Sequence, residues 1–385
     1  MRVKNITAAV LCAFFMPLMA YAKPVEQVQL DNIIQPLMTK FQIPGLAIAV
    51  SIEGEDHFYN YGVASKESQQ PVTRDTLFEI GSLSKTFTGT LATWAQGEGK
   101  LSFDDPASKY FPPLQGTAFD NISLLHLATH TSGLPLLEPE GVTTDEQLMV
   151  WYQQWQPVLP AGNQRIYSNM GVGLLGLATA KSLGQSFNDA MQQRMLPALG
   201  MSNTYLQVPK EKMDSYAQGY NRKDQPVRVS PGIVDAEAYG LKSSATDLIR
   251  FLNINMQAVP IDAKWQRAVN ATHTGYYQVS QFVQDIMWES YPYPTPLSTL
   301  TNNNSPRIIF ESHTARLLTP PQAPQQWAMY NKTGSTNGFS CYVLFVPAKK
   351  MAIVILANKS YPNIARVKAA YDILALVDPQ LKPME

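Results

Sequence analysis

Two pairs of strand-like segments, one near each end of the chain, constrain the fold more than any other sequence feature. Residues 46–52 and 57–63 have strand patterns on either side of a Glu-Gly-Glu turn. Residues 342–346 and 351–357 form a second pair, joined by the short turn Pro-Ala-Lys-Lys. Strands at both ends, with helices beside them, predict one sheet that is assembled from the two termini.

Helical patterns flank both strand pairs. Apolar residues recur with helical spacing between Leu30 and Phe41, and Pro44 and Gly45 end that pattern. The same spacing returns between Ile364 and Leu374, before Pro379. One amphipathic helix is therefore expected to precede the first strand pair, and another to follow the last.

The middle of the chain has a different character. Residues 82–225 carry several helical patterns, broken by loops that contain Pro and Gly. They predict a mostly helical domain inserted into a sheet domain made of residues 23–81 and 226–385. The predicted fold class is an α/β (α+β) sandwich: an antiparallel sheet built from both termini and flanked by helices, with the helical domain inserted. Clefts form where domains meet, so a site is expected between the two.

The first 22 residues read as a cleavable signal peptide. Arg2 and Lys4 are basic, residues 8–19 are apolar, and Ala-Tyr-Ala at 20–22 is a typical cleavage site. Cleavage would leave 28 basic residues of the original 30, against 30 acidic ones, so nothing favours binding to nucleic acid. The pattern predicts a periplasmic protein that keeps no membrane anchor after cleavage, and we expect a monomer.

The cysteine content predicts a chain without an internal disulfide. Of the two cysteines, Cys12 would leave with the signal peptide, and Cys341 would then have no partner. No other apolar stretch approaches the 18 residues that a membrane span requires.

An S-x-x-K pair, Ser82 and Lys85, is the first candidate for chemistry. Phe87, Leu91 and Trp94 continue with helical spacing, so the serine is predicted at the first turn of a helix, with the lysine one turn on. A serine hydroxyl becomes a useful nucleophile when a neighbouring base takes its proton, and a lysine with a lowered pKa can be that base. Alone, the pair is weak, because a capping serine beside a solvated lysine gives the same string.

Two further motifs follow in a fixed order. Tyr167-Ser168-Asn169 stands in a predicted loop, and Lys332-Thr333-Gly334 stands at the start of the C-terminal strand pattern. The set S-x-x-K, Y-x-N and K-T-G is typical of serine enzymes that recognise penicillins. Residues this far apart in sequence must be gathered by the fold, as a cleft between two domains would do.

On these motifs the chain resembles the class C β-lactamases, the cephalosporinase family. The resemblance covers nearly the whole mature chain. It includes residues 78–85, 167–169, 230–240, 332–334 and 357–366. No E-x-x-L-N string, which class A enzymes use, follows the tyrosine motif.

The resemblance implies a mechanism. Ser82 would attack the lactam carbonyl, and the N–H groups of Ser82 and Ser335 would form the oxyanion hole. Lys85 and Tyr167 would share the acid–base work, and which of them takes the serine proton stays open because interacting groups titrate as a unit. Tyr167, held between Lys85 and Lys332, would activate the water that clears the acyl-enzyme.

It also implies a set of substrate contacts. Lys332 and Thr333 would hold the substrate carboxylate, Asn169 the amide side chain, and Tyr239 would line the pocket wall. Gly334, Asn363 and Arg366 complete the expected binding residues. The expected partner is a small β-lactam, and no cofactor or metal is expected.

The chain departs from the family around residues 129–137. This stretch is one residue shorter than usual, and Leu137 stands in place of a glutamine that commonly contacts the substrate amide. His130 stands where tyrosine is common, and Ser360 where asparagine or a related polar residue is frequent. These changes leave the preferred β-lactams open.

Several other interpretations are weaker. His126 and His130 fall four apart on one predicted helix but lack the glutamate of H-E-x-x-H, so packing is favoured over zinc. The G-x-G-x-x-G of residues 171–176 follows a loop, which favours helix packing over nucleotide binding. A D-alanyl-D-alanine carboxypeptidase or endopeptidase, or a serine esterase of the same superfamily, remains the alternative function.

Overall fold

The computed structural model describes residues 24–382, and the predicted signal peptide at 1–22 lies outside them. Within that range ten strands form one sheet in the order β2-β1-β15-β14-β13-β11-β10-β9-β12-β4. Its strands are β1 (Gly45–Ile52), β2 (Glu55–Gly62), β4 (Gln164–Arg165), β9 (Gly275–Val279), β10 (Phe282–Gln284), β11 (Glu289–Pro292), β12 (His313–Gln322), β13 (Ala328–Ser335), β14 (Ser340–Val346) and β15 (Met351–Ala357).

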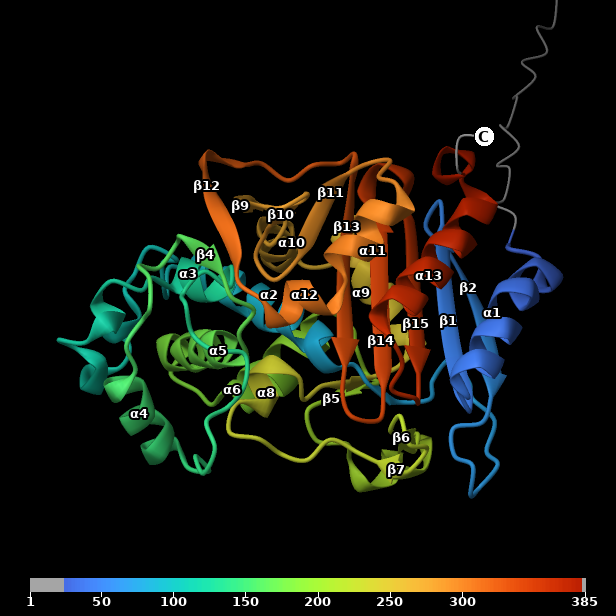
Figure 1. The fold of residues 1–385 in the computed structure, drawn as a ribbon, viewed down its shortest axis with the longest axis horizontal. Helices are drawn as coiled ribbons and strands as arrows, with labels where there is room; N and C mark the ends of the chain where they lie inside the picture. The colour runs from blue at the N-terminus through green and yellow to red at the C-terminus, as the bar shows by residue number, and fades with distance from the viewer. Residues whose placement is uncertain (1–23, 383–385) are drawn as a thin grey trace, which may run out of the picture.

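The prediction of a sheet built from both termini is confirmed. Strands β1 and β15 pair antiparallel, with Ile48 opposite Ile355, so the two ends of the chain are neighbours in space (Figure 1). Two small sheets add β3 (Phe78–Glu79), β8 (Lys242–Ser243) and β5 (Thr204–Tyr205), and β6 (Gly219–Tyr220) and β7 (Pro226–Val227).

Helices cover both faces of the sheet. The α-helices are α1 (Gln27–Phe41), α2 (Ser84–Gly97), α3 (Leu124–Ala128), α4 (Asp145–Gln154), α5 (Asn169–Leu183), α6 (Phe187–Asp189), α7 (Leu196–Ala198), α8 (Asp235–Ala238), α9 (Ala245–Asn255), α10 (Ala263–Ala271), α11 (Leu297–Asn303), α12 (Pro306–Phe310) and α13 (Asn363–Val377). The 3₁₀ turns are η1 (Gly81–Leu83), η2 (Ala107–Lys109), η3 (Pro112–Leu114), η4 (Ala118–Asp120), η6 (Lys210–Ser215), η7 (Pro347–Lys349) and η8 (Pro379–Leu381), and η5 (Ala190–Met195) is a π-helix.

The strands divide their side chains between two cores. Along β1, Leu46, Ile48 and Val50 join the core beneath α1 and α13, whereas Ala47 and Ala49 join the core shared with α2, α9 and α10. This alternation is the two-residue period of a strand that is covered on both faces. Both terminal helices therefore lie on one face, as Figure 1 shows.

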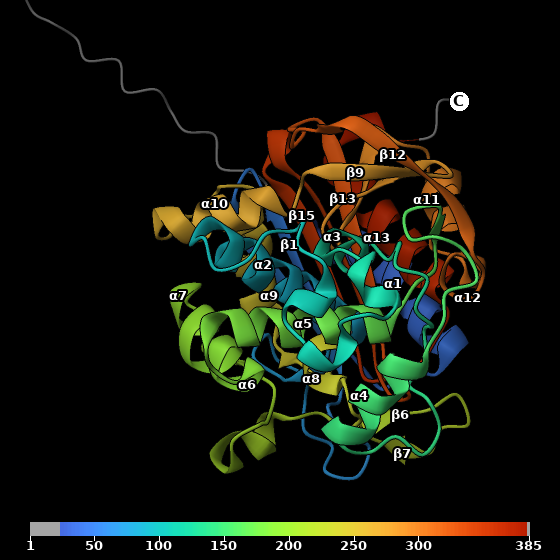
Figure 2. The same ribbon diagram turned by 90° about the vertical axis from the view of Figure 1, so that its left-hand side faces the viewer.

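A third core holds the helices of the middle region together. Side chains of α2, α3, α4 and α5 pack around Phe119, and Tyr276 of strand β9 packs against this core. Helices α3, α4 and α5 lie to the left of the sheet in Figure 1 and in front of it in Figure 2. The domain boundaries expected near residues 81 and 225 stay a prediction.

Candidate active site

The S-x-x-K pair lies where the sheet meets the helices. Ser82 occupies the 3₁₀ turn η1, directly before α2, rather than the first turn of the α-helix that the sequence predicted. In a 3₁₀ turn, side chains three residues apart eclipse one another. This geometry places Lys85 Nζ 3.2 Å from Ser82 Oγ.

A glycine allows this turn to approach the end of β13. Gly81 has a φ of +52°, and a Cβ atom at that position would lie 2.5 Å from the backbone nitrogen of Ser335. On the other side, a Cβ at Gly334 would lie 1.9 Å from the carbonyl oxygen of Ile80. The backbones of Ser82 and Ser335, the two predicted oxyanion-hole residues, are thus held close together.

Lys85 is fully buried, at 0% exposure. Its ammonium also donates to the carbonyl oxygen of Ala238 at 2.8 Å. Burial, assisted by the positive charge of Lys332 and opposed by Tyr167, lowers the pKa of Lys85 to about 8. An amine with such a pKa exchanges protons with its neighbours near neutral pH.

Tyr167 follows β4 and precedes α5, and it is only 4% exposed. The hydroxyl of Ser168 caps α5 by accepting from the Gly171 N–H at 2.7 Å, which fixes the backbone next to the tyrosine. The phenol oxygen accepts from Lys332 Nζ at 3.0 Å. Burial alone would raise its pKa, but Lys332 and Lys85 outweigh burial and lower the pKa of Tyr167 to about 8.

These four side chains, Ser82, Lys85, Tyr167 and Lys332, are called the acid–base cluster below. The structure brings them together from η1, α2, the β4–α5 connection and β13. The K-T-G motif differs from its prediction in one respect. Lys332, Thr333 and Gly334 lie at the carboxyl end of β13, one strand before the C-terminal pair β14 and β15. Because β13 ends beside Tyr167, the side chain of Lys332 reaches the cluster from this strand.

Two residues that sequence reasoning did not assign to the site pack behind Tyr167. Arg165 is buried, donates to Glu289 at 2.8 Å and to Gln284 at 2.7 Å, and its guanidinium lies 5.4 Å from the Tyr167 ring centre. His130 lies against the same ring, with centroids 4.3 Å apart. For Arg165 the only sequence signal is its position two residues before the tyrosine.

His130 corrects a sequence expectation. Helix α3 ends at Ala128, and His130 has a φ of +60°, so it does not share a helix with His126. Its Nδ1 accepts from the Ser168 N–H at 3.2 Å. Burial, together with the cations Arg165, Lys85 and Lys332, holds the pKa of His130 well below its usual value, so the ring is neutral.

The second histidine of that pair is also used structurally. His126 caps α3 together with Ser123, whose backbone N–H donates to His126 Nδ1 at 3.1 Å. No group of three or more metal-ligating side chains occurs between residues 24 and 382.

The glycine motif in α5 serves helix packing, as predicted. A Cβ at Gly173 would lie 2.4 Å from Val234, and one at Gly176 would lie 2.4 Å from Glu237. These glycines let α5 approach α8 closely.

The predicted binding residues Asn363 and Arg366 lie at the start of α13. Arg366 is buried and donates to the carbonyl oxygens of Gly334, Cys341 and Tyr361, and to the side-chain oxygens of Ser335 and Asn363. It therefore organises the end of β13. Direct contact of Arg366 with a substrate carboxylate stays a prediction.

Asn169 and Tyr239 lie on the other side of the cluster. Asn169 begins α5, its backbone N–H donates to Leu136 at 3.1 Å, and its buried Oδ1 has no hydrogen-bond partner among the residues described. Tyr239 follows Ala238, whose carbonyl accepts from Lys85, and its hydroxyl donates to Glu138 at 2.6 Å. We call residues 136–138 and 232–239 the side-chain wall.

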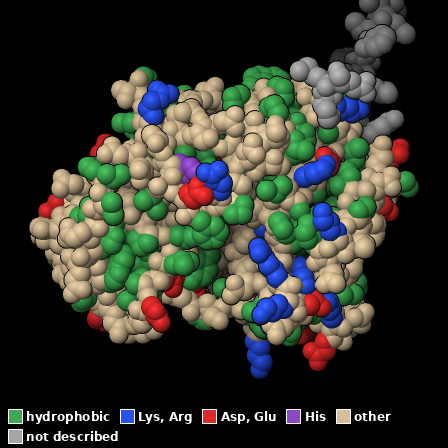
Figure 3. All heavy atoms as spheres, in the orientation of Figure 1, with side chains coloured by type: hydrophobic (Ala, Val, Ile, Leu, Met, Phe, Trp, Pro, Cys, Tyr) green, Lys and Arg blue, Asp and Glu red, His purple; other side chains and the backbone are tan. Residues whose placement is uncertain are grey.

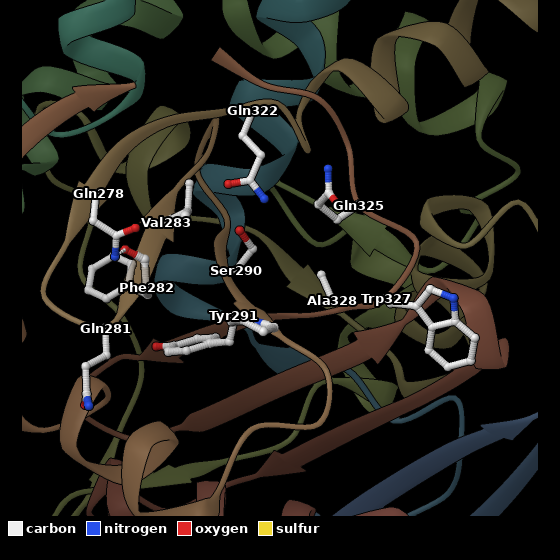
Figure 4. A pocket seen from close by; sticks show the side chains of 11 residues that line it. Gln278, Gln281, Phe282, Val283, Ser290, Tyr291, Gln322, Gln325, Trp327 and Ala328 are labelled. Carbon is white, nitrogen blue, oxygen red and sulfur yellow. Dashed lines mark hydrogen bonds between the residues drawn. The ribbon is translucent and has the colours of Figure 1, made fainter. Parts of the chain in front are cut away.

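The surface is hollowed between the helical part and the sheet part. In Figure 3, hydrophobic side chains lie to the left of this hollow, and Lys and Arg side chains gather to its right. A separate pocket of about 320 Å³ lies between β9–β11 and the segment before β13 (Figure 4). Its lining, which includes Gln278, Gln322 and Trp327, contains none of the acid–base cluster.

Two further expectations concern the rest of the chain. Cys341 is buried on β14 and forms no disulfide within the described part of the chain. Over the same part, no helix combines the length and the hydropathy needed to cross a membrane.

Comparison with known proteins identifies the family. The sequence model of the family Beta-lactamase matches residues 30–378. A β-lactamase of Providencia stuartii is 51% identical over 354 residues, covering 92% of each chain. A β-lactamase of Pseudomonas fluorescens is 49% identical over 358 residues, covering 93% of this chain and 100% of the relative.

Solved structures agree with these relatives. A class C β-lactamase in complex with cefoxitin superposes with a TM-score of 0.89 at 50% identity, covering 90% of this chain and 98% of the other. A β-lactamase/D-alanine carboxypeptidase from Pseudomonas syringae superposes with a TM-score of 0.90 at 49% identity, covering 91% and 99%. The chain therefore belongs to the β-lactamase family, and its structure is that of a class C enzyme.

Proposed function

We propose that this protein hydrolyses the amide bond of β-lactams, with cephalosporins favoured, through an acyl-enzyme on Ser82. The observation that carries the proposal is the contact between the serine and Lys85, in a cluster where Lys85 and Tyr167 both have shifted pKa values. Lys85 Nζ lies 3.2 Å from Ser82 Oγ, Lys332 Nζ lies 3.0 Å from Tyr167 OH, and the pKa values of Lys85 and Tyr167 are both about 8. Such groups can pass a proton to and from a nucleophile near neutral pH.

In acylation, Ser82 Oγ attacks the lactam carbonyl carbon while its proton moves to the pair formed by Lys85 and Tyr167. The N–H groups of Ser82 and Ser335 stabilise the negative charge on the carbonyl oxygen. The C–N bond then breaks, and the lactam nitrogen takes a proton from Tyr167. The result is an ester on Ser82.

In deacylation, Tyr167 accepts a proton from a water molecule that attacks the ester carbonyl. The C–Oγ bond breaks and Ser82 regains its proton. Lys85 and Lys332 keep positive charge beside the phenol, which favours the phenolate that this step requires. A β-lactamase needs this second step to be fast.

The remaining predicted residues orient the substrate. Lys332 and Thr333 bind the substrate carboxylate at the end of β13, where Arg366, itself held by Asn363, donates to the Gly334 carbonyl and the Ser335 hydroxyl. The buried Oδ1 of Asn169, without a partner among residues 24–382, is free to accept the amide N–H of an acyl side chain. Tyr239 forms part of the wall beside that side chain.

A D-alanyl-D-alanine carboxypeptidase is the second candidate. The structure from Pseudomonas syringae carries both names, and it resembles this chain over 91% of its length. Both reactions begin with the same attack by a serine, and they differ in how fast water clears the acyl-enzyme.

Turnover of a chromogenic cephalosporin, benzylpenicillin and a D-Ala-D-Ala peptide, measured side by side, tests the proposal. We expect the cephalosporin to be hydrolysed catalytically and the peptide slowly. Mass spectrometry should find a transient adduct on Ser82 that is absent in Ser82→Ala. Stoichiometric acylation by the lactams, with turnover of the peptide alone, would assign the peptidase function instead.

The sequence supports two further proposals about the mature protein. The basic, apolar and small-residue order of residues 1–22 favours export to the periplasm with removal of the segment. We also propose that the protein acts as a monomer made of the two domains delimited near residues 81 and 225.

A further inference from the structure

Glu138, the residue after Leu137, contributes a carboxylate to the side-chain wall. The backbone N–H of Asn169 donates to the carbonyl of Leu136, which places residues 136–138 beside the amide-binding residue. In the second segment of the wall, residues 232–239, Tyr239 directly follows Ala238, whose carbonyl accepts from Lys85. The 2.6 Å hydrogen bond from Tyr239 OH to Glu138 Oε1 therefore joins two loops next to both Asn169 and Lys85.

The position of this carboxylate is well defined. Its second oxygen, Oε2, accepts from the Ile233 N–H at 3.1 Å. The backbone of Gly232 lies so close that a Cβ there would be 2.2 Å from Tyr239 OH and 2.6 Å from Glu138 Oε2. Because both oxygens have partners and a glycine gives them room, Glu138 is part of the wall rather than a solvated side chain.

The wall is acidic. Burial, the hydrogen bond to Glu138, and the charges of Glu138, Asp235 and Glu237 all raise the pKa of Tyr239. Burial, with smaller contributions from neighbouring acids, raises the pKa of Glu237 to about 8, so Glu237 is largely neutral at pH 7. The other two acids of the wall, Glu138 and Asp235, are only partly buried; burial raises the pKa of Asp235, and the positive charge of Lys242 opposes that rise.

The opposite side of the cluster is basic. Lys332 and Arg366 are both buried around the end of β13, where the substrate carboxylate is proposed to bind. A ligand that spans the site meets cations near its carboxylate and an anion near its acyl side chain. Such a charge arrangement discriminates between ligands chiefly by repelling the wrong sign.

We propose that Glu138 is a specificity-determining residue that makes the site favour β-lactams with an ammonium group on the acyl side chain over those with a carboxylate there. The proposal rests on the proposed function, because it takes Asn169 to bind the amide from which that side chain extends.

Three penicillins with the same phenylacetyl frame provide the test. Benzylpenicillin has hydrogen on the side-chain α-carbon, ampicillin an ammonium and carbenicillin a carboxylate. The measurement is kcat/KM for each, and the ratio of ampicillin to carbenicillin reports the charge preference independently of the overall rate. Glu138→Gln should lower that ratio by about five- to tenfold, as expected for the loss of one charge near the ligand.

Glu140→Gln is the matched control. Glu140 is exposed, two residues farther along, and its replacement changes the net charge by the same amount. We expect its ampicillin-to-carbenicillin ratio to stay within about twofold of wild type, since an exposed charge is screened by solvent and salt.

A second measurement uses the wild-type enzyme alone. Raising the ionic strength from about 0.01 M to about 0.5 M should lower the ampicillin-to-carbenicillin ratio, because the Debye length shrinks from about 30 Å to a few ångströms. An unchanged ratio in Glu138→Gln or with salt, while benzylpenicillin is still hydrolysed, would overturn the inference. Absence of turnover of benzylpenicillin and a cephalosporin by wild-type enzyme would instead overturn the proposed function.

Discussion

The acid–base cluster and the side-chain wall face the same site, but the chain builds them differently. Lys85, Tyr167 and Lys332 are 0%, 4% and 3% exposed, and each is attached to a helix, a strand or a helix cap. The wall consists of loop residues and the single-turn helix α8, and its Leu137 is 69% exposed.

This difference suggests that the cluster determines the rate of the reaction and the wall determines which substrates are preferred. In the cluster, burial and mutual charge determine the pKa values, so moving any one side chain changes the others. On the wall, contacts such as that of Tyr239 with Glu138 are replaceable without disturbing a strand or a long helix. Substitutions in the cluster should therefore change the rate for every substrate, and substitutions on the wall should change the ranking of substrates.

Tyr167→Phe is the strongest test of the expectation that a substitution in the cluster changes the rate for every substrate. The variant keeps the ring against His130 but removes the oxygen that accepts from Lys332. We expect kcat/KM for a chromogenic cephalosporin to fall by about a hundredfold or more, as for lost general acid–base catalysis. All substrates should be affected alike.

Tyr152→Phe is a matched control in the third core. Its phenol is fully buried and donates to the carbonyl of Met170 at 2.8 Å rather than to a member of the cluster. It should cost about 1 kcal/mol of unfolding free energy, typical of a lost hydrogen bond, and leave kcat/KM within about twofold. Equal rates in Tyr167→Phe and Tyr152→Phe would mean that another group does the proton transfer.

The same division explains what could be predicted from the sequence. The paired strands at the termini were predictable because β1, β14 and β15 are apolar runs between turn residues, and their pairing follows from the need to cover both faces. The cluster members were predictable because the three motifs are short and ordered.

Other features depend on contacts that leave no local pattern. The ion pair of Arg165 with Glu289 joins β4 to β11, residues 124 apart, and neither side chain stands out in its own segment. The left-handed backbone at His130 breaks a helix that its neighbours would continue. The bond between Glu138 and Tyr239 requires two loops whose paths depend on the packing of α5 against α8.

The buried His130, which packs against the cluster, should make the stability of the fold depend on pH. The unfolded chain protonates a histidine below about pH 6.5, whereas the buried ring stays neutral, so stability is lost as the pH falls. Phe at position 130 keeps an aromatic ring against Tyr167 but cannot take up a proton. In His130→Phe the decrease in unfolding free energy from pH 7 to pH 5 should therefore be smaller than in the wild type by about 2 kcal/mol. Urea unfolding at both pH values measures the difference.

His273→Phe is the control for that experiment. Burial lowers the pKa of His273 to about 3, and its Nε2 lies 2.8 Å from Asn255, in the core shared with α9 and α10. It should change the acid sensitivity by a similar amount while leaving kcat unchanged. His130→Phe should also alter the pH profile of kcat, because its ring contacts Tyr167. If both variants leave that profile unchanged, His130 is structural only.

Leu137→Gln should give the smallest effect on stability and a selective effect on turnover. Leu137 is mostly exposed, so the change should alter the free energy of unfolding by less than about 0.5 kcal/mol. The amide adds a donor and an acceptor one residue before Glu138, where an acyl side chain is proposed to lie. We expect kcat/KM to rise about two- to fivefold for substrates with an amide-linked side chain, an increment of the size of one exposed hydrogen bond. A β-lactam without that amide should show no change, and an equal gain for both would mean that the wall acts on the rate rather than on the choice of substrate.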